Sequence, residues 1–586
     1  MLKIFRYLKP KEWLQALCSL VFIVAQVWLD LKLPDYMAEI TQLVQTPGSK
    51  MSQIWTAGGY MLLCALGSLF GAIIVGYFAA RIAASFSQRL RSMLFNKVDS
   101  FSMGEINRFS TASLITRSTN DITQIQMVVT MGLQIIVKAP ILAVWAITKI
   151  AGKGYEWSLA TGVAILILIL MFTFVIIFVM PRFMKMQTLT DNLNRVVREN
   201  LAGLRVVRAY NAENYQEEKF EAANKELTDV NLFTNRAMSI LMPVMSMIVN
   251  GLSLAIYWIG AYLINSAPAA EKLTLFSNMV VFSSYAMQVI MAFMMMVMIF
   301  MLLPRASVSA KRINEVLDTE PTILDGNVTE GKSGLAGEVT FKNVSFKYPG
   351  AADYVLQDVS FTVKKGETIA FIGSTGSGKS TLINLVPRFF DTTEGEIFVD
   401  GVNVKNYMLE ALYNKIGYVP QKAVLFKGSV NSNVAYGENG EGNYTEEEAK
   451  NAVRIAQGSD FVEKMEGNYQ AEIAQSGTNV SGGQKQRLAI ARAVCRKPEI
   501  YIFDDSFSAL DYKTDRILRS ELKKETAGVT SMIVAQRIGT IMDADQIIVL
   551  DEGKIVGKGT HKELLQSCAV YKEIAMSQLS EEELVS

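Results

Sequence analysis

The stretch Gly373–Thr381, with the sequence GSTGSGKST, constrains this chain more than any other. It matches the spacing G-x-x-x-x-G-K-[ST], follows an apolar run at 368–372 that is typical of a buried strand, and leads into a helical pattern at 381–385. In this context glycines let backbone N–H groups point at a phosphate, and the helix N-terminus adds a favourable partial charge. The predicted phosphate-binding loop comprises Gly373, Ser374, Thr375, Gly376, Ser377, Gly378, Lys379, Ser380 and Thr381. Lys379 is expected on the β- and γ-phosphates, and the Ser380 hydroxyl on Mg²⁺.

The composition indicates that part of the chain lies in lipid. Half of the 586 residues are hydrophobic, and residues 1–305 contain long intervals without a charged side chain. The formal charge of +1 gives no basic excess, so we expect no nucleic acid partner. The four cysteines lie far apart and lack C-x-x-C spacing, which favours free thiols in a reducing compartment.

Six apolar stretches within residues 13–304 are long enough to cross a bilayer, which takes about 20 apolar residues. The expected spans are 13–29, 51–80, 122–137, 157–181, 237–270 and 273–304, with the first and third continuing past charged residues. Residues 1–12 are basic and amphipathic, so we expect an interfacial helix on the inner leaflet and no cleavable signal. Residues 305–335 are charged and non-periodic and are interpreted as a linker.

The distribution of lysine and arginine predicts the orientation in a plasma membrane. The N-terminus and the connections 81–120 and 182–236 are rich in both residues, and we therefore expect them to be cytoplasmic. Both connections are too long for simple turns, and 192–227 has apolar residues at helical spacing. Helices are therefore expected to extend well below the membrane and to turn near 103–115 and 207–220.

Two features of the spans leave alternatives open. Asp30, Lys32 and Lys138 are charges close to apolar stretches, which marks either a partnered interior site or side chains at the membrane interface. The sixth span is rich in methionine, a flexible and polarisable residue that suits varied apolar ligands but also ordinary bundle packing and lipid contact. These methionines are Met287, Met291, Met294, Met295, Met296, Met298 and Met301.

Residues 336–586 have the pattern of a soluble α/β domain with further candidate nucleotide contacts. An apolar strand at 499–504 ends in Asp504, the place where phosphate-loop ATPases hold a magnesium-coordinating acid. Between that strand and the loop lie Ser481, Gly482, Gly483 and Gln484, which open a helix at 485–495. A Ser-Gly-Gly turn at a helix N-terminus is a second anion-binding device, although alone it is often only a capped helix.

Together these residues resemble an ATP-binding cassette (ABC) transporter half of the exporter type, over essentially the whole chain. The matching motifs are the Walker A loop 373–381, the Q-loop Gln421, the signature 480–484, the Walker B strand 500–504 and the D-loop 508–511, and Tyr348 matches the aromatic that stacks on adenine. The resemblance implies a bundle of six transmembrane helices with long cytoplasmic extensions, plus an α/β P-loop domain. It also implies a dimer that holds two ATP molecules, each between one chain's Walker A and the other's signature, with Mg²⁺ at Ser380, Gln421 and Asp504.

Two positions depart from the family pattern. The residue after the Walker B aspartate is usually a glutamate that polarises the attacking water, and here it is Asp505. The switch histidine expected after the strand 531–535 is Gln536, and the only histidine of the chain is His561. Glutamine can hydrogen-bond a phosphate but carries no positive charge. We therefore expect a degenerate site in a heterodimer with a second ABC half-transporter, although two weakly active sites in a homodimer remain an alternative.

The resemblance implies ATP-driven export of hydrophobic or amphipathic compounds, and we expect bacterial multidrug efflux. Two alternatives stay open: a lipid flippase, because a methionine-rich lining also suits a lipid tail, and a nucleotide-gated channel or regulatory subunit, which tolerates slow hydrolysis. Membrane lipid is expected as a partner in each case. Peptide export with leader cleavage is disfavoured, since no domain that could hold a cysteine protease precedes Trp13.

Overall fold

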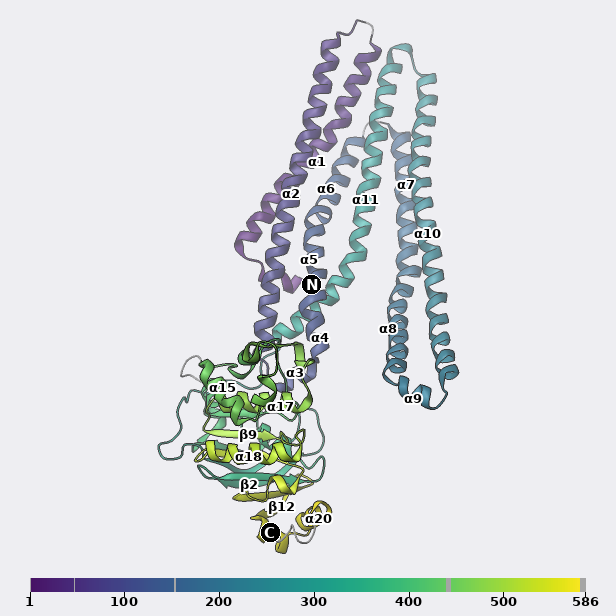
Figure 1. Ribbon diagram of the computed structural model, residues 1–586. Helices are drawn as coiled ribbons and strands as arrows, with labels where there is room; N and C mark the ends of the chain where they lie inside the picture. Colours follow the sequence, from purple (N-terminus) through teal and green to yellow (C-terminus); the bar gives the residue numbers. More distant parts are fainter. Residues whose placement is uncertain (1, 47, 152–153, 439–443, 580–586) are drawn as a thin grey trace. The chain divides into compact units, whose positions relative to one another are not determined.

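The computed structural model describes residues 2–46, 48–151, 154–438 and 444–579 and divides into two compact units (Figure 1). The helical unit contains 1–98 and 112–319, and the sheet unit contains 99–111 and 320–586. Each unit is described by itself below.

Helices of six to 54 residues build the helical unit. They are α1 (Pro10–Gln45), α2 (Met51–Asp99), α4 (Thr111–Thr116), α5 (Ile122–Met131), α6 (Lys138–Ile150), α7 (Tyr155–Phe174), α8 (Met180–Ala202), α9 (Leu204–Ala209), α10 (Glu213–Ser266) and α11 (Ala269–Asp318). In the described part of the chain, six helical stretches are long and apolar enough to cross a membrane, which confirms the predicted bundle. A helix rises about 1.5 Å per residue, so α2, α10 and α11, with 49, 54 and 50 residues, are longer than a bilayer is thick.

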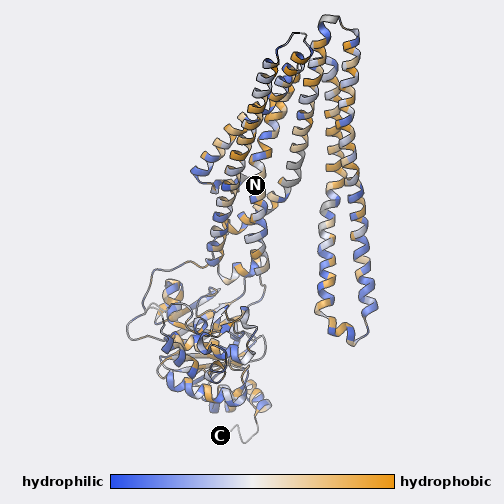
Figure 2. Cartoon of the chain, turned by 45° about the horizontal axis from the view of Figure 1, so that its top comes forward, coloured by the Kyte–Doolittle hydropathy of each residue, from blue (hydrophilic) through white to orange (hydrophobic). Residues whose placement is uncertain are grey.

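The paired helices α7–α8 and α10 change from hydrophobic to hydrophilic along their length. In Figure 2 their upper part is mainly hydrophobic, whereas hydrophilic residues dominate the lower half, near the turn that holds α9. Met298 and Met301 lie outside the residues whose side chains the structure describes. Among the other methionines of the sixth span, Met291 is exposed, and Met294 and Met296 pack partly buried against the bundle core.

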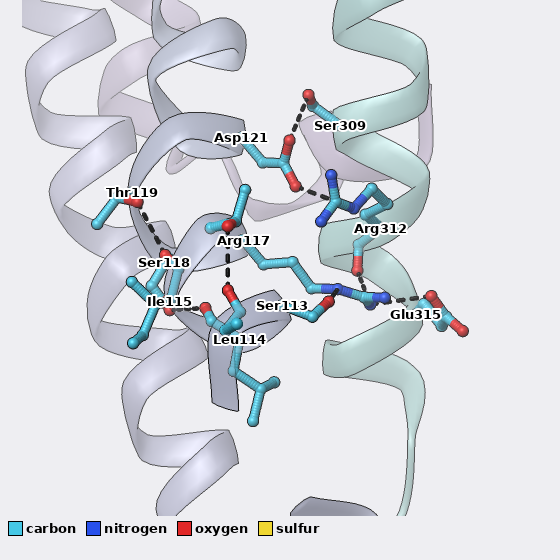
Figure 3. Close-up of polar contacts among 12 residues, drawn as sticks. Ser113, Leu114, Ile115, Arg117, Ser118, Thr119, Asp121, Ser309, Arg312 and Glu315 are labelled. Carbon is cyan, nitrogen blue, oxygen red and sulfur yellow. Dashed lines mark hydrogen bonds and ion pairs between the residues drawn. The ribbon is translucent and has the colours of Figure 1, made fainter. Parts of the chain in front are cut away.

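Segments of π-helix interrupt the third and fourth spans. They are η2 (Arg117–Asp121), η3 (Gly132–Ile136) and η4 (Val175–Val179). At η2, buried charges bind the C-terminal part of α11 (Figure 3): Asp121 accepts a 2.8 Å hydrogen bond from the Ser309 hydroxyl and lies 3.3 Å from the Arg312 Nε. Arg117 donates to the Arg312 carbonyl and to Glu315. The π-turns join α4, α5 and α6 without leaving the helical path.

The charges that the sequence places near the spans have partners. Asp30 of α1 lies 3.1 Å from the Lys138 Nζ of α6 and also accepts a hydrogen bond from Ser68. Asp35, one turn further along α1, lies 2.8 Å from the Lys149 Nζ and accepts a hydrogen bond from the Tyr285 hydroxyl of α11. Two ion pairs thus join α1 to α6, which favours the partnered-site interpretation over isolated interfacial charges.

Three segments differ in detail from expectation. The N-terminus forms a short 3₁₀-helix, η1 (Leu2–Tyr7), and α1 already begins at Pro10, where proline suits the first helical turn. The turn between α8 and α10 lies at 203–212, slightly before the predicted 207–220. The helix α11 continues to Asp318, into the stretch interpreted as a linker, and Lys3 and Arg6 both form ion pairs with Asp318.

The sheet unit contains a mostly parallel sheet with the strand order β12-β11-β3-β10-β9-β6. Its strands are β3 (Thr368–Gly373), β6 (Ile416–Val419), β9 (Ile500–Asp504), β10 (Thr530–Val534), β11 (Gln546–Asp551) and β12 (Lys554–Gly559). Only β12 pairs antiparallel within the described sheet. The strands β3 and β9 are almost continuously buried, as expected for parallel strands with both faces covered.

The remaining strands form an antiparallel sheet, β2-β1-β4-β5, and a small pair, β7-β8. Their bounds are β1 (Val339–Phe346), β2 (Leu356–Val363), β4 (Glu394–Val399), β5 (Val402–Asn403), β7 (Gly428–Ser429) and β8 (Glu472–Ile473). The helices are α3 (Met103–Phe109), α12 (Lys379–Asn384), α13 (Leu409–Asn414), α14 (Val430–Val434), α15 (Glu446–Ile455), α16 (Ser459–Val462), α17 (Gly482–Cys495), α18 (Tyr512–Glu525), α19 (His561–Ser567) and α20 (Ala569–Gln578).

The helix α3 belongs to the sheet unit although it lies between two membrane spans in sequence. Ser102 and Glu105 form a capping box at its start, and the Thr322 hydroxyl donates a 2.8 Å hydrogen bond to the Glu105 carboxylate. Burial acts to raise the pKa of Glu105, but the hydrogen bonds from Ser102 and Thr322 outweigh it and lower that pKa. The predicted first cytoplasmic turn is therefore a capped helix attached to the sheet unit.

Candidate ATP-binding site

The site residues meet because four adjacent parallel strands end at the same edge of the sheet. In the order β3-β10-β9-β6, these ends lead to the loop 373–381, to Gln536, to Asp504 and Asp505, and to Gln421. Ligands of open α/β sheets bind beyond the carboxyl ends of the strands. The topology thus brings together residues that lie up to 163 positions apart, the separation between Gly373 and Gln536 (536 − 373).

The loop adopts the backbone that its glycines permit. Gly373, Gly376 and Gly378 have φ values of 152°, 86° and 95°. A Cβ on Gly378 would lie 2.9 Å from the Val355 carbonyl oxygen, whereas a Cβ on Gly376 would meet no atom within 4 Å. Close approach therefore requires glycine at 378, and backbone conformation favours glycine at 376.

Lys379 lies at the first position of α12 and folds back over the loop. Its Nζ donates hydrogen bonds to the Gly373 and Ser374 carbonyl oxygens, at 2.9 and 2.7 Å. Burial lowers the pKa of Lys379, and the charges of Asp505 and Asp504 counteract that effect. The ammonium group thus lies in the centre of the loop, where it can meet phosphate oxygens.

Ser380 and Asp504 form a hydrogen-bonded pair where α12 meets the end of β9. The Ser380 hydroxyl donates a 2.7 Å hydrogen bond to the Asp504 carboxylate, and Asp504 is almost fully buried. Burial raises the pKa of Asp504, whereas the hydrogen bond from Ser380 and the charge of Lys379 lower it. Hydroxyl and carboxylate oxygens are ligands that Mg²⁺ prefers, so these two residues fit the ion. Bound there, Mg²⁺ would neutralise phosphate charge.

The Asp505 carboxylate contacts both Gln536 and the Q-loop residue Gln421. Its Oδ2 accepts a 2.8 Å hydrogen bond from the Gln536 Nε2 and a 3.3 Å hydrogen bond from the Gln421 Nε2. Burial raises the pKa of Asp505, whereas the hydrogen bond from Gln421 lowers it. Two neutral amides therefore hold this carboxylate.

The aromatic and signature residues have their own arrangements. The Tyr348 ring packs edge-on against Phe390, and its hydroxyl lies 2.9 Å from the Thr381 Oγ1 at the loop. Ser481 caps α17 in a capping box with Gln484, so that Gly482 and Gly483 form its first turn. A Cβ on Gly483 would lie 3.3 Å from the Ala509 carbonyl oxygen of the D-loop segment. The signature thus presents a helix N-terminus to a ligand or partner.

The sequence analysis missed Gln578, the last residue of α20, at the back of the site. Its Nε2 donates to the Gln536 carbonyl oxygen, and its Oε1 accepts from the Ile538 N–H, both at 2.8 Å. No motif marks this residue, because the contact joins backbone groups to a side chain far along the sequence. The buried surface of α20, with Tyr571 and Ala575 facing inward, is the only local signal that this helix docks on the sheet.

Comparison with known proteins assigns the chain to a family. The model of the ABC transporter transmembrane region matches residues 16–302, and the ABC transporter model matches residues 356–508. The chain belongs to the ABC transporters, with membrane and ATP-binding regions fused in one polypeptide. The class couples ATP to transport, and the present fold is that of an exporter.

Individual relatives agree with this assignment. An uncharacterized ABC transporter ATP-binding protein of Mycobacterium tuberculosis is 42% identical over 471 residues, covering 80% of this chain and 79% of the relative. An ATP-dependent lipid A-core flippase of Pseudomonas fluorescens is 34% identical over 390 residues, covering 67% of this chain and 63% of the relative. The structure of a bacterial Atm1-family ABC exporter with ATP bound has the same fold, with a TM-score of 0.78 at 24% identity over 97% of this chain and 100% of that chain.

Proposed function

We propose that this chain is one half of a heterodimeric multidrug exporter whose own site binds ATP with Mg²⁺ but hydrolyses it slowly. The observation that carries the proposal is the amide-held carboxylate of Asp505. Aspartate is one methylene shorter than the usual glutamate, and a displacement of about 1 Å at a reacting centre can cost on the order of 10²-fold in rate. Gln536, as an amide, neither accepts a proton from water nor gains charge near neutral pH.

The signature supports a division of labour between two chains. Ser481, Gly482, Gly483 and Gln484 retain the family pattern, and the capped N-terminus of α17 is intact. In a dimer of the family type, this signature would complete the ATP site of the partner. The partner would then own the faster site, while this chain would hold ATP and keep the dimer closed.

The membrane unit supports hydrophobic or amphipathic substrates. Its bundle is apolar, and methionines of α11 offer a polarisable surface, with Met291 exposed. Basic residues gather in the connections proposed to be cytoplasmic, so ATP binding and coupling belong on the inner side of the plasma membrane.

The test measures ATP hydrolysis by the purified chain alone and together with a candidate partner half from the same genome. We expect activity only in the mixed dimer, and its loss when the Walker B glutamate of the partner is replaced by glutamine. In a complex that carries this partner change, Asp505→Glu combined with Gln536→His should restore hydrolysis at the site of this chain. Ordinary hydrolysis by the chain alone would instead establish the homodimer with two working sites.

Lipid flipping is the second candidate, because a relative covering two thirds of this chain is named a lipid A-core flippase. An amphipathic lipid is chemically a member of the proposed substrate class. Reconstituted vesicles separate the two functions: ATP-dependent movement of a labelled lipid between leaflets, without efflux of cationic dyes, would favour flipping. Dye efflux with unchanged lipid distribution would favour multidrug export.

A further inference from the structure

The C-terminal helix α20 reaches the loop that follows β10, and this loop carries Gln536. Gln578 contacts this loop at two points: its side chain donates to the Gln536 carbonyl oxygen and accepts from the Ile538 N–H, each at 2.8 Å. One primary amide thus satisfies one backbone acceptor and one backbone donor two residues apart. Such a two-pronged contact fixes the path of the loop as well as its distance from α20.

The residues that flank this contact form the base of the same loop. Ala535 and Ile538 are buried, at 3% and 0% exposure, in one apolar cluster with Tyr571 and Ala575 of α20. At the other end of α20, the Tyr571 hydroxyl lies 2.6 Å from the His561 Nδ1 of α19. Apolar burial therefore holds the base of the loop and the body of α20, while the Gln578 amide holds the exposed backbone between the two buried residues.

The position of Ile538 at a helix start explains why its N–H requires an acceptor from another segment. Ile538 is the first residue of the 3₁₀-helix η8 (Ile538–Thr540), and the first N–H groups of a helix lack an acceptor within the helix. Gln578 provides that acceptor from outside. Gln536 lies two residues before this helix start, so the reach of its side chain to Asp505 depends on how the helix start is held.

We propose that Gln578 is a positioning residue of the ATP site: it holds the loop 536–538 so that the Gln536 side chain faces Asp505 and the γ-phosphate position. This inference rests on the proposed role of Gln536 at that site. The C-terminal helix thereby becomes part of the nucleotide machinery, although none of its residues belongs to a nucleotide motif.

The test uses the full chain in lipid nanodiscs, together with its partner half if it requires one. Gln578→Ala removes both hydrogen bonds, and Gln578→Glu keeps the acceptor for Ile538 but loses the donor to Gln536. Met576→Ala, at a side chain 52% exposed on the same helix, is the matched control. Because Gln578 is exposed, neither of its variants opens a cavity in the core.

Two readouts separate loop position from nucleotide chemistry. Amide hydrogen exchange across 535–540 without nucleotide reports the loop, and retention of radiolabelled ATP with Mg²⁺ after dilution reports the site. We expect Gln578→Ala to accelerate exchange about fivefold or more, the ratio for the net loss of a hydrogen bond, and to shorten ATP retention. Gln578→Glu should lie between Gln578→Ala and the original chain, and Met576→Ala should match the original chain.

A double variant tests whether Gln578 acts through Gln536. In a chain that already carries Gln536→Ala, Gln578→Ala should not shorten ATP retention further. An additional loss, or normal exchange and retention in Gln578→Ala alone, would overturn the inference. If Gln536→Ala leaves retention unchanged while Gln578→Ala still accelerates exchange, the loop-holding role of Gln578 stands and the proposed role of Gln536 fails.

Discussion

At the residue scale, the positions of some site residues follow from motif spacing, whereas their contacts depend on how the chain folds. The loop 373–381 was located from the sequence because it continues directly from β3, and Asp504 and Asp505 because they lie at the end of β9. That Gln421 and Gln536 both donate to one carboxylate oxygen was not predicted, since it depends on the order β10-β9-β6 in the sheet. The contact of Gln578 lay further out of reach, because α20 follows every motif in the chain.

Two glycines of the loop give a matched pair of substitutions. Gly376→Ala should cost about 1–2 kcal/mol, because alanine at φ 86° is strained although its Cβ meets open space. Gly378→Ala should cost more, since its Cβ would also lie 2.8 Å from the Leu356 Cδ2 and 2.9 Å from the Val355 carbonyl oxygen. Thermal unfolding of the sheet unit without nucleotide measures both changes, and equal losses would contradict the steric argument.

At the element scale, the sequence predicted the six spans but not how the helices are joined. Hydropathy identifies an apolar stretch whether the helix is regular or contains a π-turn, so η2, η3 and η4 left no visible signal. The extension of α11 to Asp318 was missed because residues 305–318 are charged. Their helix is stabilised by tertiary ion pairs with η1 and η2, which local periodicity does not record.

The contact between η2 and α11 predicts unequal effects for two acidic residues (Figure 3). Asp121→Ala should destabilise the helical unit by about 1–3 kcal/mol, because it leaves Ser309 and Arg312 without their buried acceptor. Glu315→Ala should cost about 0–1 kcal/mol, since the Glu315 side chain is 46% exposed to solvent. Thermal unfolding in detergent compares the two variants, and a larger loss for Glu315→Ala would refute the assignment of Asp121 as the main contact.

At the scale of the whole molecule, charge distribution predicted an orientation that the fold alone does not give. The positive-inside rule uses where lysine and arginine lie along the chain, and a helical bundle has the same internal contacts in either orientation. Composition likewise indicated that one part of the chain lies in lipid and another part in water. The division into a helical unit and a sheet unit follows that pattern, except that 99–111 joins the sheet unit through Glu105 and Thr322.

Labelling with a membrane-impermeant maleimide tests the orientation in intact cells. Tyr155→Cys, at the first residue of α7 and next to the connection between the third and fourth spans, should react from outside. Tyr210→Cys, near α9, should react only after the cells are permeabilised. The two side chains are similarly exposed, at 77% and 80%, so accessibility within the protein does not explain a difference. The original chain controls for its own cysteines, and the reverse labelling pattern would invert the predicted topology.

The hydrogen bond between Gln536 and Asp505 also affects how the site can change during evolution. With Asp505→Glu alone, a longer side chain would enter the space where the Gln536 amide already lies 2.8 Å from the carboxylate. With Gln536→His alone, Asp505 would lose the hydrogen bond from the Gln536 amide, and its side chain would still be one methylene shorter than that of glutamate. Each single step back toward the family pattern thus passes through a poorly fitted intermediate. The residues at the two positions are therefore expected to change together, and the pair should resist reversal one residue at a time.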